Sequence, residues 1–232
     1  MKKHIMAIGA HIGDAELTCG KTLATHFLKG DDITTVAVTA GERGAPPDRD
    51  IKEFKQHNID CATAFAKALG GNHICMNIPD GETEDNEELR RNIAKIIREC
   101  KPDVILTHWE HGMHKDHRIT ARAVKDAVYY ASLRDYEIDG LPRHGLTGGL
   151  YYAENWEDPI GFEPYVFIDV SAGYDLWHTE IQKLWLTNNS PWFKYLQHYV
   201  GLSAVRGALI RKERAECFAV EPYARRIVKD GF

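Results

Sequence analysis

Cysteines are few in this 232-residue sequence, and their spacing forms no recognisable pattern. The five cysteines are widely separated, odd in number and contain no CxxC pair, which argues against a disulfide framework or a cysteine-ligated zinc finger. Long apolar runs are also missing. The N-terminal apolar stretch spans about six residues before charge returns, too short for a membrane span or the hydrophobic region of a signal peptide. These absences predict a cytoplasmic protein with no membrane span.

Runs of basic residues and internal repeats are absent as well. The 29 Lys and Arg residues are scattered among 34 acidic residues, and the formal net charge is -5. Nucleic acid or an anionic membrane is therefore not expected as the principal partner. The hydrophobic fraction of 44% and the charged fraction of 27% are typical of folded soluble proteins. We expect residues 1–232 to form a single domain that binds a small polar ligand.

Apolar strand-like runs alternate with helical patterns through the first half of the chain. The expected strands are residues 4–10, 33–38, 74–78 and 104–107, and the expected helices are 14–28, 51–69, 85–99 and 119–131. Such alternation is typical of a mostly parallel sheet that is covered by helices on both faces. The sequence predicts an α/β, Rossmann-like core over about residues 1–131.

The regular alternation ends after this core, and a C-terminal β/α extension is expected over about residues 132–232. Its expected strands are 150–152 and 165–170, and its expected helices are 175–187 and about 203–218. The aromatic segment 188–200 is interpreted as core or as an interface between copies, in preference to a wall of a substrate cleft. A homo-oligomer is consistent with this interpretation.

Two loops that follow expected strands are rich in metal-ligand chemistry. Residues 9–16 contain His11 and Asp14, and residues 107–117 contain four of the twelve histidines. Ligands of open α/β sheets bind beyond the carboxyl ends of the strands. A histidine from the second loop would complete a His/Asp/His set with an open coordination position, as in catalytic divalent-metal sites.

Each loop also has a simpler explanation when it is taken alone. Asp14 could be a helix N-cap beside a surface histidine, and the second loop could be a solvated polar segment. Because both loops follow strands of one parallel sheet, their combination favours a metal site.

A nucleotide-binding loop is the main alternative at the first helix. Residues 19–22 read CGKT, like the end of a phosphate-binding P-loop, but the glycine that this motif requires at position 15 is Ala15. No G-x-G-x-x-G follows the first strand either. We therefore expect no nucleotide site, and we interpret Lys21 as an exposed helix residue.

These loops resemble the motifs of the PIG-L/LmbE family of zinc-dependent deacetylases. Residues 10–16 read AHIGDAE and are similar to the family's A-H-P-D-D-x-E, and residues 114–117 read HKDH and are similar to its H-P-D-H. Residues 39–44 (TAGERG) and 79–81 (PDG) are similar to two further family motifs. The resemblance implies removal of an acetyl or related acyl group from an amide on a small, N-acetylated, sugar-like substrate.

The resemblance also implies roles for individual residues. Zn²⁺ would be held by His11, Asp14 and His117, although such a ligand set also accepts iron or another divalent metal. His114 would stabilise the oxyanion and protonate the leaving amine, and Asp116 would orient a neighbouring histidine. Two residues would contact the substrate, Asp80 through sugar hydroxyls and Glu42 at the wall of the cleft.

One departure from the family pattern concerns the general base. The family carries it on the first Asp of H-P-D-D, where this chain has Gly13. A positioned base contributes about 10²–10⁴ to the rate, although zinc still activates bound water. Asp116, Glu16 and Glu42 are candidate replacements, and Asp116 is preferred because it adjoins an expected ligand. The alternative is a catalytically impaired homologue that binds metal and ligand.

Overall fold

The computed structural model describes residues 2–157 and 160–226, and its centre is one seven-stranded sheet. The strand order is β3-β2-β1-β4-β5-β7-β6. β1 to β5 run parallel, whereas β7 is antiparallel to both of its neighbours. The strands are β1 (His4–His11), β2 (Asp32–Thr39), β3 (Asn72–Ile78), β4 (Val104–His108), β5 (Gly149–Ala153), β6 (Val166–Asp169) and β7 (Ala215–Ala219).

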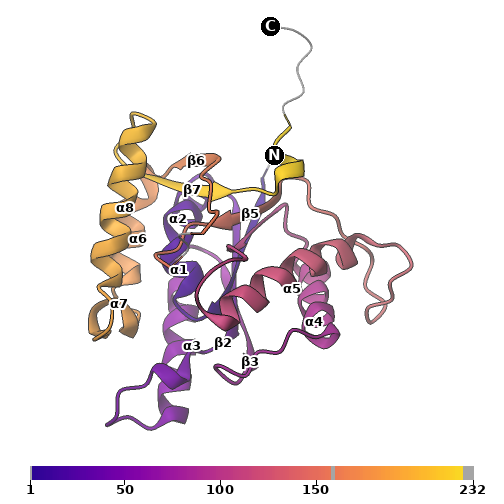
Figure 1. Cartoon of the computed structure of the whole chain (residues 1–232), viewed down its shortest axis with the longest axis horizontal. Helices are drawn as coiled ribbons and strands as arrows, with labels where there is room; N and C mark the ends of the chain where they lie inside the picture. Colours follow the sequence, from indigo (N-terminus) through magenta and orange to yellow (C-terminus); the bar gives the residue numbers. More distant parts are fainter. Residues whose placement is uncertain (1, 158–159, 227–232) are drawn as a thin grey trace, which may run out of the picture.

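Helices cover both faces of the sheet (Figure 1). They are α1 (Asp14–Thr18), α2 (Gly20–Leu28), α3 (Ile51–Ala68), α4 (Glu87–Cys100), α5 (Lys115–Ser132), α6 (Tyr174–Ile181), α7 (Trp185–Asn189) and α8 (Tyr195–Leu209), with short 3-10 turns η1 (Glu42–Gly44), η2 (Ser171–Gly173) and η3 (Pro222–Ala224). The predicted fold class, a mostly parallel α/β sheet with helices on both faces, is confirmed. Among the described residues, no helix combines the length and the apolar character needed to cross a membrane.

Strand β1 shows why both faces need a helical layer. Its side chains alternate between the two faces, so Ile5 and Ala7 join one apolar cluster while Met6 and Ile8 join the other. The first cluster is completed by α1, α2, α3, α6 and α8, and the second by α4 and α5. Because the central strand is apolar on both sides, neither face can be left in water.

Several predicted helix boundaries are wrong. The predicted helix 14–28 is divided at Cys19, which is the C-cap of α1 and the N-cap of α2. The predicted helix 203–218 is two elements: α8 begins earlier, at Tyr195, and the chain turns at Arg211 (φ 58°) into strand β7. All five residues of β7 are buried. Pairing with β5 and β6 on its two sides, which helical spacing cannot reveal, explains this outcome.

The prediction that Lys21 is exposed is also wrong. Its side chain is 1% exposed, and its Nζ lies 2.9 Å from Oε1 of Glu216 on β7 and 3.8 Å from the ring centroid of Trp177 on α6. Burial lowers the pKa of Lys21, although the charge of Glu216 opposes that effect. The partner that makes this burial tolerable comes from far along the chain.

Candidate metal centre

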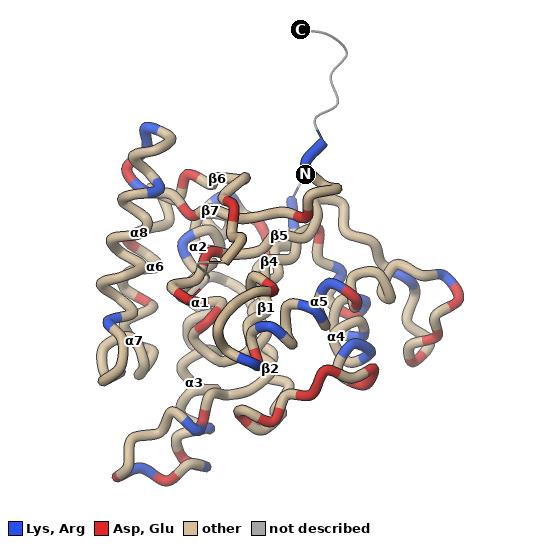
Figure 2. The backbone as a smooth tube through the Cα atoms, viewed as in Figure 1, with Lys and Arg blue, Asp and Glu red and all other residues tan. Residues whose placement is uncertain are grey.

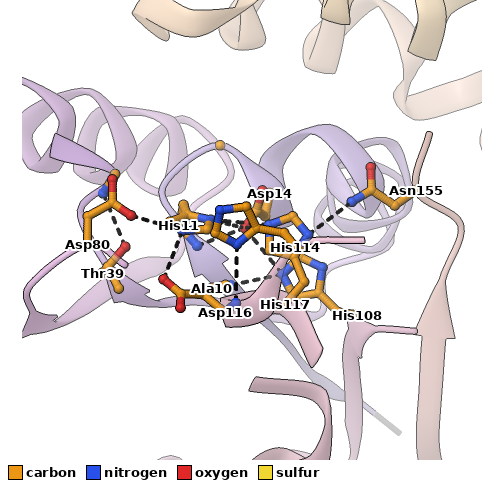
Figure 3. A network of polar contacts seen from close by, with 12 residues as sticks. Ala10, His11, Asp14, Thr39, Asp80, His108, His114, Asp116, His117 and Asn155 are labelled. Atoms are coloured by element: carbon orange, nitrogen blue, oxygen red, sulfur yellow. Dashed lines mark hydrogen bonds and ion pairs between the residues drawn. The ribbon is translucent and has the colours of Figure 1, made fainter. Parts of the chain in front are cut away.

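The two histidine-containing loops meet at the carboxyl ends of neighbouring strands. β1 pairs with β2 on one side and with β4 on the other, so the crevice between β1 and β4 is the topological switch point where α/β sheets bind ligands. His11 ends β1, Asp14 begins α1, and His117 lies in the first turn of α5. Figure 3 shows these three side chains directed toward one another.

Three atoms form a nearly equilateral triangle in this crevice. His11 Nδ1 lies 3.2 Å from Asp14 Oδ2 and 3.1 Å from His117 Nε2, and His117 Nε2 lies 3.2 Å from Asp14 Oδ2. Two ligands of one tetrahedral zinc ion, each about 2.0–2.1 Å from it, are separated by about 3.3 Å. The donor types and the spacing therefore fit a divalent cation held by the three residues expected from the sequence.

The electrostatics of the triangle also favour positive charge. Burial raises the pKa of Asp14, but the charges of His117 and His108 outweigh it and hold that pKa well below its usual value. Burial lowers the pKa of His117, but the charge of Asp14 and hydrogen bonds to Asp14 and Glu157 raise it to about 9. Asp14 thus stays ionised, and the cluster stabilises a cation placed against it.

Two carboxylates contact the opposite nitrogen of His11. Its Nε2 lies 3.2 Å from Asp80 Oδ1 and 3.4 Å from Asp116 Oδ2. An Nε2–H donated to these oxygens leaves the Nδ1 lone pair free for a metal, as second-sphere carboxylates do in other metal sites. Asp116 is fully buried, and its Oδ2 also accepts the Gly81 N–H at 2.9 Å.

Asp80 and Glu42 form a chain of hydrogen bonds behind His11. Asp80 Oδ2 accepts the Arg43 N–H at 3.0 Å, and the Asp80 N–H donates to Glu42 Oε1 at 3.1 Å. Both carboxylate oxygens of Asp80 therefore have protein partners. Glu42 acts on the Asp80 loop, and the contacts described for it do not include the three triangle residues.

His114 is the N-cap of α5, which fixes its tautomer. Its Nδ1 accepts the Asp116 N–H at 3.2 Å, so the neutral ring carries its proton on Nε2. Burial and the neighbouring imidazoles of His11 and His117 lower the pKa of His114. Its ring meets that of His11 edge-on, with the ring centroids 4.8 Å apart. A neutral N–H donor thus lies beside the triangle.

Gly13 lies inside the ligand loop in a conformation that other residues rarely adopt. Its φ is 110°, and an added Cβ would lie 2.2 Å from Cδ2 of Leu186 on α7. The Gly13 N–H donates to Glu16 Oε2 at 2.9 Å, and burial raises the pKa of Glu16 to about 7. The space beside residue 13 is therefore filled by an apolar side chain, and Glu16 caps the loop.

Four residues that border the centre were not assigned by the sequence reasoning. His108 ends β4, accepts the Ala10 N–H at 2.9 Å and stacks on His117 at 4.1 Å. Glu157 contacts His117 Nδ1, and Asn155 Nδ2 lies 3.5 Å from the same atom. Tyr199 donates to Asn155 Oδ1 at 2.5 Å. His108 could have been found from its place at a strand end, whereas the other three follow from tertiary structure alone.

The fold and the centre together define an α/β domain with a histidine and carboxylate cluster at the switch point of its sheet. The PIG-L family model, described as GlcNAc-PI de-N-acetylase, matches residues 6–128, more than half of the chain. The chain belongs to this family.

Two curated relatives and one solved structure extend the comparison. A 1D-myo-inositol 2-acetamido-2-deoxy-alpha-D-glucopyranoside deacetylase of Thermomonospora curvata is 29% identical over 52% of this chain, and the chain spans only 52% of its length. A 4-oxalmesaconate hydratase of Pseudomonas putida is 21% identical, and the match covers 78% of this chain and 72% of the hydratase. The solved 4-carboxy-2-hydroxymuconate hydratase of Pseudomonas putida has a TM-score of 0.85 at 20% identity, over 100% of both chains, and shows a shared fold.

Proposed function

We propose that this protein is a metal-dependent hydrolase that removes an acetyl or related acyl group from an amide on a small sugar-like substrate. The observation that carries the proposal is the triangle of His11, Asp14 and His117, with edges of 3.1–3.2 Å. Membership of the GlcNAc-PI de-N-acetylase family supports the amide substrate. The relative from Thermomonospora curvata, named for an acetamido sugar, supports the substrate class.

The triangle residues would hold Zn²⁺ or another divalent metal. When bound, such a cation polarises a carbonyl oxygen and lowers the pKa of water. Asp14 supplies the anionic ligand, and the two imidazoles supply neutral nitrogens. The carboxylates of Asp116 and Glu157 orient those imidazoles from behind, His11 and His117 respectively.

His114 is proposed to stabilise the charge that develops on the carbonyl oxygen. Its Nε2–H is held in place because Nδ1 already accepts the Asp116 N–H. A preorganised donor of this kind is worth about 10²–10³ in rate. Because this ring is neutral and its Nδ1 already accepts a hydrogen bond, we propose that the departing amine takes its proton from solvent.

The three candidate replacement carboxylates all have other partners in the structure. Glu16 is bonded to Gly13 N–H and Glu42 to Asp80 N–H. Of the three candidates, only Asp116 contacts a triangle residue, and it does so at Nε2 of His11. Because this nitrogen is on the far side of the ring from the triangle, the contact favours a positioning role over proton abstraction. We propose that Asp116 positions His11 and that turnover proceeds without a dedicated side-chain base, with solvent accepting the proton that the attacking water loses. The cost is about 10²–10⁴ in rate.

The proposal is tested by metal content and by turnover on a panel of N-acetylated amino sugars with added zinc. We expect one divalent metal per chain, lost in Asp14→Asn, and release of acetate by the wild type. His114→Gln should keep the metal and lose turnover, whereas His111→Gln, in an exposed residue of the same loop, should change neither. Bound metal without turnover on any acylated substrate would instead identify the impaired homologue.

Hydration is a second candidate because the 4-oxalmesaconate hydratase aligns with a larger share of this chain than the deacetylase does. Addition of water to an activated double bond uses the same polarising chemistry. The carboxylates that surround the triangle, including Asp80, Asp116 and Glu157, disfavour a polyanionic substrate, so we rank hydration second. Consumption of 4-oxalmesaconate by the wild type, with no acetate release from any acetamide, would reverse this order.

A further inference from the structure

A groove of about 610 Å³ lies beside the candidate metal centre. Its walls come from the loop between β2 and α3, the start of α3, and the segment from α7 to the start of α8. Pockets of this volume hold small molecules. Its lining includes Ile12, Gly41, Asn58, Trp185, Leu186 and Trp192.

The groove is continuous with the ligand loop. Ile12, which lines it, directly follows His11 in the chain. Gly41, another lining residue, approaches His11 so closely that an added Cβ would lie 3.5 Å from the Cβ of His11. On the opposite wall, Leu186 packs against Gly13. A molecule whose reacting carbonyl lies at the triangle can therefore extend directly into the groove.

Three uncharged polar side chains of the lining have partners within the protein. Asn58 Nδ2 donates to Ala40 O at 2.9 Å, and Asn189 Nδ2 donates to Trp185 O at 2.8 Å. Ser190 Oγ lies 3.4 Å from two backbone N–H donors just after it. These groups are therefore less available to the hydroxyl groups of a sugar ring, and unpaired polar groups are costly to bury.

Trp185 and Trp192 place aromatic rings in the lining, whereas the lining residue Phe54 is only 3% exposed and packs against Trp185. Phe54 and Trp185 meet edge-on with their centroids 5.2 Å apart, and Trp192 is 92% exposed. Residues 184–193 contain no charged side chain, and the tube is accordingly tan along α7 (Figure 2). The guanidinium of Arg43, also in the lining, is paired with Glu82.

We propose that this groove binds an aromatic ring carried by the substrate, beside the bond that reacts at the metal centre. The inference rests on the proposed function, because that function places the reacting carbonyl at the triangle. The sequence favoured core or an interface between copies for segment 188–200. For the exposed part of that segment, we propose a wall of the substrate groove instead. Tyr199 of the same segment is buried in the core.

Binding of two glucosides that lack an amide tests the groove without any turnover. We expect the metal-loaded protein to bind p-nitrophenyl β-D-glucopyranoside at least about tenfold more tightly than methyl β-D-glucopyranoside, by calorimetry. Trp192→Ala should reduce this preference to within about threefold, and Trp192→Phe should restore most of it. Tyr129→Ala, a change to an aromatic residue 61% exposed elsewhere, is the matched control.

Equal binding of the two glucosides, or an aryl preference that survives Trp192→Ala, would overturn the proposal. A change of oligomeric state in Trp192→Ala without aryl binding would also overturn it and identify an interface between copies. The corresponding p-nitrophenyl and methyl N-acetylglucosaminides then test turnover. Aryl preference in binding with no acetate release would leave the groove in place and contradict the hydrolase function alone.

Discussion

Restoring an aspartate at position 13 is the direct test of the missing base, and the structure predicts that the single substitution is resisted. A side chain at φ 110° is strained by about 1–3 kcal/mol. Its Cβ would also lie 2.2 Å from Cδ2 of Leu186, and overpacking of this kind costs about 1–3 kcal/mol. We expect Gly13→Asp to lower the free energy of unfolding by about 2–6 kcal/mol.

The melting temperature measures this cost. For a chain of this size each kcal/mol shifts Tm by about 2–4 °C, so a loss near 3 kcal/mol lowers Tm by about 6–12 °C. Leu186 is only partly buried, and Leu186→Ala alone should cost about 1–2 kcal/mol, less than a fully buried leucine. The double variant removes the overlap, so it should be more stable than the sum of the single changes by about 1–3 kcal/mol.

A comparison of Gly13 with Gly30 separates the cost of backbone strain from the cost of overlap with Leu186. Gly30 has a similar φ of 89° with nothing within 4 Å of an added Cβ. Gly30→Ala should therefore cost only the strain, and Gly13→Ala should cost clearly more. Additive effects of Gly13→Asp and Leu186→Ala, or a Gly13→Asp variant as stable as the wild type, would refute the reasoning. Acetate release is then compared between wild type and the double variant, which should be faster by about 10²–10⁴ if residue 13 supplies a base.

Three further outcomes follow from the contacts of the centre and the core. Glu157→Ala should weaken zinc binding about 10–100-fold in a chelator competition, and Glu157→Gln should weaken it less because an amide oxygen still accepts from His117 Nδ1; equal affinity in all three proteins would contradict the positioning role. Because the pKa of His117 is about 9 without metal, zinc binding at pH 7 should release protons and strengthen as pH rises, and calorimetry in buffers of different ionisation enthalpy measures the number released. Lys21→Met should lower the free energy of unfolding by about 3–5 kcal/mol by leaving Glu216 buried without its partner, and adding Glu216→Gln should recover part of the loss; urea denaturation distinguishes these results.

The sequence predicts most of the parallel core because its signals are local. The apolar runs of β1 and β4 and the loops that follow them are each contained in a short segment, and parallel pairing brings their ends together. His11, Asp14 and a histidine of the second loop could therefore be grouped before the structure was known, and the family resemblance implied that this histidine is His117. Lys21 and β7 could not, because each is buried by partners far along the chain: Glu216 for Lys21, and β5 and β6 for β7.

The difference between local and long-range signals also explains why the sequence predicted the contacts around Asp116 only in part. The family resemblance implied an orienting role for Asp116, and its position next to His117 made it the preferred replacement base, but sequence adjacency could not show which imidazole it faces. Helix α5 begins at Lys115 with His114 as its cap, so the Asp116 backbone N–H bonds to His114 while its carboxylate turns toward His11. One residue thus fixes the tautomer of the proposed oxyanion donor through its backbone and that of a proposed metal ligand through its side chain.

The candidate metal centre is bordered by carboxylates on one side and by the apolar side chain of Leu186 on the side of Gly13. Carboxylates lie behind His11 and His117, whereas the side next to residue 13 is closed by a leucine that also lines the aromatic groove. An aspartate at position 13 would place a charge on that wall. Under the proposed function, glycine at position 13 removes a base and also leaves an apolar side chain between the ligand loop and the groove, so the two proposals have one structural origin. Leu186→Ala in combination with Gly13→Asp should therefore raise turnover and reduce the aryl preference together.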